Sequence, residues 1–156
     1  MSPAGLKLIE RAVAEAVEKC INMGWDAAYN VSVEGESGIP HKFLMAVWVN
    51  KGGRPDVVVD LMEGEDGVPE DAVLRFVVKC VDVDARYKIL IASPHLSWRA
   101  KLLLMGHDTK IIELCNNGIS DISTEIVEAA RELCEGEGGR VENLVSVLEE
   151  LGDDTL

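Results

Sequence analysis

Four polar side chains occupy positions where metal or acid–base chemistry is conceivable. Asp60 follows the apolar run over residues 57–59, Glu36 lies in a Gly-Ser turn, His41 follows that turn, and Lys79 lies in a helical segment. Carboxylate oxygens are ligands that hard divalent cations such as Mg²⁺ prefer. Each residue also has a structural interpretation: Asp60 ends a buried strand, Lys79 is a solvated helix residue, His41 belongs to the turn, and Glu36 belongs to the surface. The residues alone leave both interpretations open.

Other kinds of site find little support in the sequence. The cysteines are far apart, which gives no close-spaced pair of zinc ligands. Each lies on or beside an apolar stripe and is interpreted as a small buried hydrophobe, with a disulfide as the alternative; they are Cys20, Cys80, Cys115 and Cys134. The glycines at 52–53 and 136–139 lack the lysine and the strand–helix setting of a phosphate loop. No spacing suggests a Ser/His/Asp or Cys/His arrangement.

The first half of the chain predicts a helix followed by three antiparallel strands. Apolar residues recur every three or four positions over residues 5–23, which is typical of one helix face. Residues 25–34 then alternate, with Tyr29, Val31 and Val33 on one side of a half-exposed strand. Two continuous apolar runs follow, as in strands buried on both faces. The hairpin turn over residues 51–54 makes these three strands an antiparallel meander.

The second half predicts alternating helices and strands. A helix begins near Pro69 and buries Val73, Val77, Cys80 and Val81. Two further strands flank a short helix capped by Ser97, and this order implies that they run parallel. Two helices, near residues 123–134 and 140–151, end the chain. We therefore expect an α/β fold, a mixed sheet with helices on both faces; its strands are expected near residues 26–34, 42–50, 56–61, 88–92 and 109–114.

This order of elements, together with several local strings, resembles the restriction-endonuclease-like superfamily, known by the motif PD-(D/E)XK. The likeness is greatest to small archaeal RecB-like predicted endonucleases and covers about residues 6–114. Order and spacing carry it rather than any single motif. The strings are GW at 24–25, NVSVEGESGIPHKF at 30–43, VVVD at 57–60, FVVKCVD at 76–82, ILIASPHLS at 89–97 and AK at 100–101.

The resemblance implies a Mg²⁺- or Mn²⁺-dependent nuclease site at the open end of the meander. Members of the superfamily place an Asp on the second strand and an acid, a spacer and a lysine on the third, where alternation directs acid and lysine to one side. The metal activates a water molecule and stabilises the leaving oxygen. Here Asp60 matches the third-strand acid, but Leu44 stands at the position of the second-strand Asp and Met62 at that of the lysine.

Other residues are candidates to replace the missing groups. Lys79, on the following helix, is the candidate for the lysine, because relatives supply it from that helix. Glu36, with Glu34 beside it, is the candidate for the missing acid. The resemblance therefore assigns catalytic roles to Asp60, Lys79, Glu36 and His41, with Asp60 and Glu36 as metal ligands. The literal Pro55-Asp56 is interpreted as closing the hairpin.

Charge weighs against tight, unaided binding to a phosphate backbone. The net charge of the chain is −13. Residues 121–156 hold eleven acids and two bases, a net of −9, which leaves −4 for residues 1–120. A neutral or basic face on the first part is therefore still allowed.

Three functions follow as hypotheses. The first is a nuclease-fold protein with weak or lost catalysis that serves as a binding or assembly module in nucleic-acid metabolism, with a protein partner such as an active paralogue, or DNA. The second is an active Mg²⁺- or Mn²⁺-dependent DNA endonuclease with a rearranged site. The third is an unrelated α/β interaction domain.

Domain organisation, assembly and location complete the predictions. Residues 1–120 are expected to form the nuclease-like core and residues 121–156 a helical extension packed on the same domain. The last helix has an apolar stripe behind a glycine-rich joint at residues 135–139. The stripe either packs on the chain's own sheet or, as we predict, forms a homodimer or docks a partner through the C-terminal part. No apolar run approaches the roughly 18 residues that span a bilayer, and the first residues lack the apolar core of a signal peptide. We therefore expect a cytoplasmic protein without a membrane partner.

Overall fold

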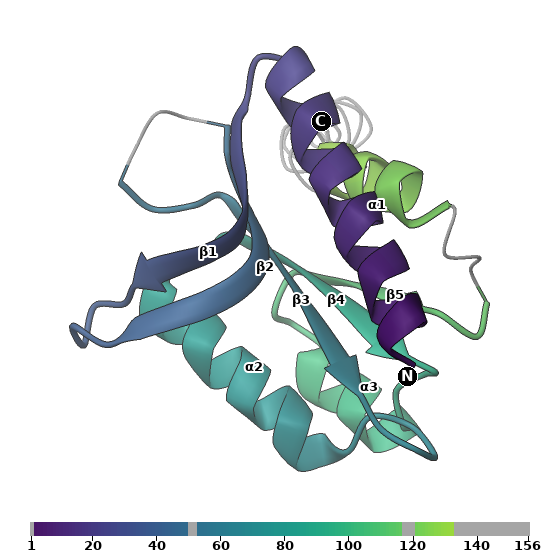
Figure 1. Ribbon diagram of the computed structural model, residues 1–156. Coiled ribbons are helices and arrows are strands. Elements are labelled where there is room, and N and C mark those ends of the chain that lie inside the picture. Colours follow the sequence, from purple (N-terminus) through teal and green to yellow (C-terminus); the bar gives the residue numbers. More distant parts are fainter. Residues whose placement is uncertain (1, 50–52, 117–120, 133–156) are drawn as a thin grey trace, which may run out of the picture.

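A computed structural model describes residues 2–49, 53–116 and 121–132 of the chain. One five-stranded mixed sheet lies between two layers of helices (Figure 1). A further helical segment spans residues 122–132. The elements are, in order, α1 (Pro3–Asn22), β1 (Asp26–Glu34), β2 (Pro40–Trp48), β3 (Val57–Glu63), α2 (Glu70–Val83), β4 (Tyr87–Ser93), α3 (Trp98–Leu104) and β5 (Thr109–Glu113).

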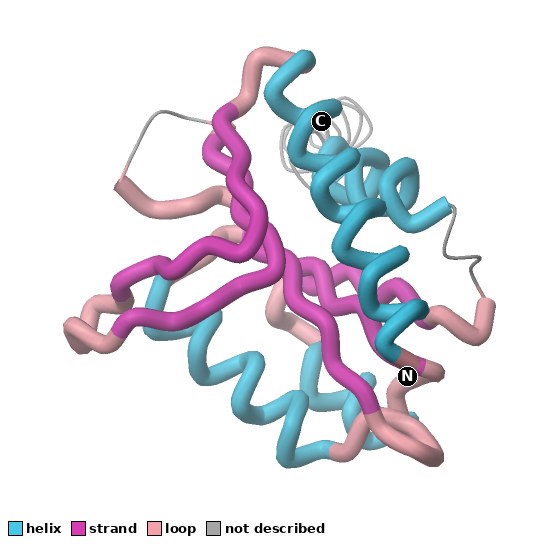
Figure 2. The backbone as a smooth tube through the Cα atoms, viewed as in Figure 1, coloured by secondary structure: helices cyan, strands magenta, loops and turns pink. Residues whose placement is uncertain are grey.

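The strands lie in the sheet in their order along the chain, from β1 to β5. β1, β2 and β3 are antiparallel neighbours, whereas β3, β4 and β5 run parallel to one another. α1 and the segment at 122–132 cover one face of the sheet, and α2 and α3 cover the other, as Figures 1 and 2 show. The predicted α/β class, the meander and the parallel pair are confirmed. Each predicted strand lies within two residues of its observed bounds.

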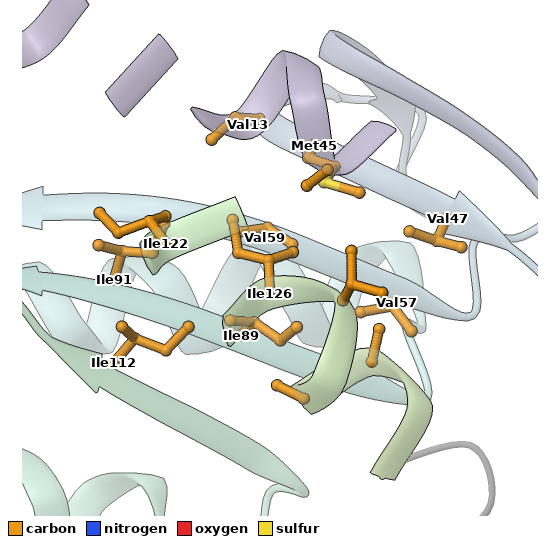
Figure 3. Close-up of a cluster of buried hydrophobic side chains, with 14 of the residues drawn as sticks. Val13, Met45, Val47, Val57, Val59, Ile89, Ile91, Ile112, Ile122 and Ile126 are labelled. Carbon is orange, nitrogen blue, oxygen red and sulfur yellow. The ribbon is translucent and has the colours of Figure 1, made fainter. Parts of the chain in front are cut away.

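Two hydrophobic clusters, one on each face, hold the layers together. We call them the α1-side cluster and the α2-side cluster. The α1-side cluster joins α1, the alternate residues of β2–β5 and the segment at 122–132 (Figure 3); its members include Val13, Met45, Val59, Ile89, Ile112 and Ile126. The α2-side cluster includes Phe43, Ala46, Val58, Phe76, Leu90 and Leu104. Because successive residues of a strand point to opposite faces, each apolar strand serves both clusters.

The faces of β1 and β2 exchange between two paired positions. Tyr29 lies opposite Met45 and Val31 lies opposite Phe43. Met45 belongs to the α1-side cluster, but Phe43 and Val31 pack in the α2-side cluster. Between them Asn30 has a positive φ of 48°, a left-handed conformation that Asn tolerates better than most residues. The prediction that Tyr29 shares a side with Val31 and Val33 was therefore wrong, because regular alternation stops at Asn30.

α2 is the helix that carries the candidate lysine, and it differs from its prediction on one flank. Its buried residues are Val73, Phe76, Cys80 and Val83, and Val77 is partly buried. Val81, expected inside, is 61% exposed. The buried stripe is thus rotated toward Phe76, and Lys79 and Asp82 come to lie on the flank that faces β2.

Several sequence predictions concern residues at the edges of the described regions. The turn over residues 51–54, the joint at residues 135–139 and the last helix lie wholly or partly outside the described residues. Ile126, Val127 and Ala130, in the helical segment at 122–132, are buried. Cys20 and Cys80 are also buried, but Cys115 is an exposed free thiol, which corrects its assignment to the core. No helix in the described part of the chain is long and apolar enough to cross a membrane.

Candidate functional site

Asp60 and Lys79 form an ion pair on the α2 face of the sheet. The lysine Nζ lies 2.5 Å from Asp60 Oδ2, and the two side chains are only 17% (Asp60) and 22% (Lys79) exposed. Asp60 is the central residue of β3, between Val59 and Leu61, which both pack on the α1 side. Alternation therefore turns Asp60 toward α2. The predicted meeting of Asp60 and Lys79 is the part of the proposed site that the fold assembles.

Two further contacts hold the Lys79 ammonium in place. It donates a hydrogen bond to the backbone carbonyl of Lys42 at 2.5 Å and lies 4.4 Å from the centre of the Phe43 ring. The ring face attracts the cation electrostatically. Asp60 Oδ1 also accepts a hydrogen bond from the backbone N–H of Leu61. The charged ends of both side chains are thus satisfied by groups of the chain itself.

A second polar cluster surrounds Asp82, one helical turn beyond Lys79. His41 Nε2 lies 2.6 Å from Asp82 Oδ2, and the Ser37 hydroxyl donates to the same oxygen at 2.6 Å. The backbone N–H of Ser37 donates to Asp82 Oδ1 at 3.0 Å. The hydroxyl bond from Ser37, then the bond from His41 and the backbone N–H of Ser37, lower the pKa of Asp82 below its usual value of 3.8. Asp82 is therefore held as a carboxylate.

The turn between β1 and β2 packs closely against the end of α2. The backbone N–H of Glu36 donates to the Asp82 carbonyl at 2.8 Å. Gly35 is buried, and a Cβ atom at this position would overlap the Asp82 carboxylate. His41, a predicted catalytic residue, thus contacts Asp82, which was not among the candidate site residues. Residues 79 and 82 are three apart on a helix and therefore share a flank, but this spacing does not pair Asp82 with His41.

The candidate metal ligands do not come together. The Glu36 side chain is exposed on the hairpin turn. Asp60 lies one residue beyond the Met45–Val59 pair, beside Leu44. Four residues of β2 separate Leu44 from the start of that strand at Pro40, or roughly 13 Å along it. Glu36 lies beyond Pro40, so it cannot share an ion with Asp60 in this arrangement.

A divalent cation at Asp60 does not fit the residues present. Mg²⁺ and Mn²⁺ need several oxygen ligands in close geometry. Asp60 offers one carboxylate, which already binds an ammonium group. In the described regions no three His, Cys, Asp or Glu side chains gather as a metal site would require. No chemical step through a metal is therefore derived from this arrangement.

Leu44 and Met62 stand at the two positions where the family motif fails. Leu44 packs against the α1-side cluster, on the face opposite to Asp60. Met62 packs in the α2-side cluster, on the same face as Asp60. Leu44 lies on the α1 side because the faces of β2 exchange between Phe43 and Met45. A carboxylate substituted at position 44 would thus point away from Asp60 unless β2 also changed.

A separate hollow opens at the carboxyl ends of β3 and β4. Its volume is about 450 Å³, and Glu63, Gly64, Glu65, Ser93 and Pro94 line it. Asp60 and Lys79 do not belong to its lining. The two glutamates make this hollow acidic, and the side chains of the ion pair contribute nothing to it.

Comparisons with known proteins define the fold only. No protein-family model and no curated protein matches the sequence. One solved structure that is similar is the crystal structure of AF1548, a protein of unknown function. It shares 14% identity at a TM-score of 0.51, over 84% of this chain and 67% of that one. The protein is accordingly an α/β protein with a five-stranded mixed sheet, and this likeness extends to architecture alone.

Proposed function

We propose that this chain is a restriction-endonuclease-like protein whose catalytic centre is lost or weakened and which acts as a binding or assembly module in nucleic-acid metabolism. The order of helix, meander, helix, strand, helix and strand supports the family assignment. The Asp60–Lys79 ion pair carries the functional part of the proposal. It uses the one carboxylate that matches the family motif in an internal contact.

Electrostatic repulsion by Lys79 opposes the binding of a divalent cation at Asp60. A divalent cation on Asp60 would come within a few ångströms of the Lys79 ammonium, and like charges at that range repel strongly in a half-buried site. The cation would have to displace Lys79 from Asp60, from the Lys42 carbonyl and from the Phe43 ring together. In the described residues no group of three His, Cys, Asp or Glu side chains is placed to hold a metal ion and so offset that loss.

The charge of the chain favours a protein partner over nucleic acid alone. With a net charge of −13, approach to a phosphate backbone is unfavourable unless a basic partner contributes. An active paralogue of the same fold with a basic surface would fit this requirement. The chain would then contribute binding surface, and its partner would contribute the catalytic carboxylates.

One observation favours the active endonuclease as a second candidate. A rearranged site requires the lysine of α2 to reach the acid of β3, and Lys79 does reach Asp60. In such a site Lys79 would hold or deprotonate the attacking water beside Asp60. His41 and Glu36 would need to move toward the pair, because both now lie at the Asp82 end of α2.

A cleavage assay separates the two candidates. Plasmid and single-stranded DNA are incubated with micromolar protein and either Mg²⁺ or Mn²⁺, and the proposal expects little or no cutting. Asp60→Asn and Lys79→Met are assayed alongside. Arg75→Met is the matched control, because Arg75 makes an exposed ion pair with Asp71 on the same helix. Robust cleavage that both site variants abolish and the control retains would establish the endonuclease instead.

A further inference from the structure

α2 exposes an apolar stripe on the flank away from β2. Leu74, Val78 and Val81 follow one another at intervals of four and three residues, so they line one side of the helix. Their exposed fractions are 48%, 65% and 61%. The residues that pack on the sheet are others, chiefly Val73, Phe76 and Cys80. The stripe is therefore additional to the core contacts of α2.

α3 repeats the same pattern. Trp98 and Leu102 lie four residues apart on α3, and Met105 follows as the residue that ends the helix. The three are 68%, 52% and 71% exposed. Ala100 and Leu104 anchor the opposite side of this short helix in the core. α2 and α3 pack against each other on the same face of the sheet (Figures 1 and 2). The two stripes thus belong to one helical layer, which we call the α2–α3 surface.

The α2–α3 surface gathers much of the exposed apolar side-chain area of the described residues. The α2–α3 surface carries half of the twelve large hydrophobic side chains that are exposed in the described regions. Summed over the six residues, the exposed area is on the order of 600 Å², whereas the largest contiguous apolar patch of a typical monomer is about 300–600 Å². A standard protein–protein interface buries about 800 Å² on each partner. With a polar rim, the surface has the size that a stable dimer needs.

The charge of this layer differs from that of the whole chain. α2 contains Glu70, Asp71, Arg75, Lys79 and Asp82, and α3 contains Arg99 and Lys101, which gives three acids and four bases. The net charge of the two helices is +1, whereas that of the chain is −13. Two copies can therefore approach through this layer without the repulsion that their other faces would produce.

We propose that the α2–α3 surface is the interface of a homodimer, in which a second copy of this chain covers both stripes about a two-fold axis. In such a contact each copy contributes the same patch. Trp98 is the expected anchor, because exposed tryptophans supply the largest apolar contact area. This assembly does not depend on whether Asp60 and Lys79 support cleavage.

The proposal differs from a dimer built through the C-terminal part, and light scattering after gel filtration tells them apart. The full chain at tens of micromolar should have twice the monomer mass of 17.0 kDa. Val78→Glu and Trp98→Glu should each weaken the dimer more than tenfold. Leu8→Glu on α1 is the matched control, since Leu8 is 47% exposed on the opposite layer. That variant should remain a dimer.

Circular dichroism and urea midpoints show whether each variant keeps its fold, and a dilution series of the unmodified chain tests dissociation without any substitution. A monomeric mass at every concentration overturns the proposal. So does a dimer that both α2–α3 variants leave intact. A dimer that is lost on deletion of residues 140–156 but kept in Val78→Glu would assign the contact to the tail and also overturn it.

Discussion

Gly35 lies directly beneath the Asp82 carboxylate, and no side chain fits between them. The contact joins the β1–β2 turn to the last turn of α2. Around it the backbone N–H groups of Glu36 and Ser37 both donate to Asp82. Glycine is required here by the close approach, since its φ is not in the left-handed region.

Replacing Gly35 should therefore separate the turn from α2. Gly35→Ala places a methyl group where the Asp82 carboxylate lies, and such overpacking typically costs about 1–3 kcal/mol of unfolding free energy. Urea denaturation measures the loss. Gly53→Ala is the control, because no atom lies within 4 Å of its added Cβ. Equal stability of the two variants would contradict the close approach.

The Asp82 cluster should make stability depend on pH below the usual carboxyl range. The folded pKa of Asp82 is lowered, so this group contributes stability that is fully present above the unfolded pKa near 3.8 and is lost as pH falls through the folded value. Urea midpoints measured between pH 7 and pH 2 should fall more steeply below pH 3.8 for the unmodified chain than for Asp82→Asn. Parallel curves would show that the Ser37 and His41 contacts do not favour the carboxylate.

The Asp60–Lys79 pair should contribute measurably to stability, unlike the surface pair on the same helix. A double-mutant cycle with Asp60→Asn and Lys79→Met should give a coupling energy of about 1–2 kcal/mol, because both side chains are mostly buried. The exposed Asp71–Arg75 pair should give less than about 0.5 kcal/mol in Asp71→Asn and Arg75→Met. A coupling no larger than that of the surface pair would mean that Asp60 and Lys79 do not hold each other.

The thiols should differ sharply in reactivity. Burial raises the pKa of the Cys80 thiol to about 12, so almost no thiolate forms at neutral pH. Cys115 is exposed and should react. Peptide mapping after brief treatment of the native chain with N-ethylmaleimide should find the label on Cys115 and none on Cys80 until urea is added. Rapid labelling of Cys80 without denaturant would show that α2 opens readily.

The sheet could be predicted from sequence because its signals are local. Continuous apolar runs and the alternation along the first strand define the strands without reference to distant residues. The ion pair was predicted only through the family resemblance, which suggested that a helix lysine reaches Asp60. The partnership of His41 with Asp82 could not be found in the same way, because it depends on the height at which α2 lies over β2. The position of α2 along β2 is determined by close packing, notably between Gly35 and Asp82. The spacing of residues in the sequence does not predict this position.

The choice of Glu36 as a substitute ligand failed for a related reason. Glu36 is near the second strand in sequence, but a hairpin tip lies at the far end of its strands and therefore far from Asp60. The exposure of Val81 shows the same limit, since valine in a helix suits either a core or an interface. Periodicity locates an apolar side of a helix, and it does not say whether the chain itself or another molecule covers that side.

The exchange of faces at Asn30 and Leu44 has a consequence for how this hairpin can change over time. The alternation of side chains between the two faces shifts by one residue at Asn30 in β1 and at Leu44 in β2. Because the two residues lie between the same two pairs, the shifts compensate each other. A residue inserted into or deleted from one strand alone would move every side chain beyond it to the opposite face of the sheet. Descendants of this sequence can therefore keep the shift or lose it only by altering both strands together. Alignments that assume unbroken alternation would place the outer half of the hairpin one residue out of step.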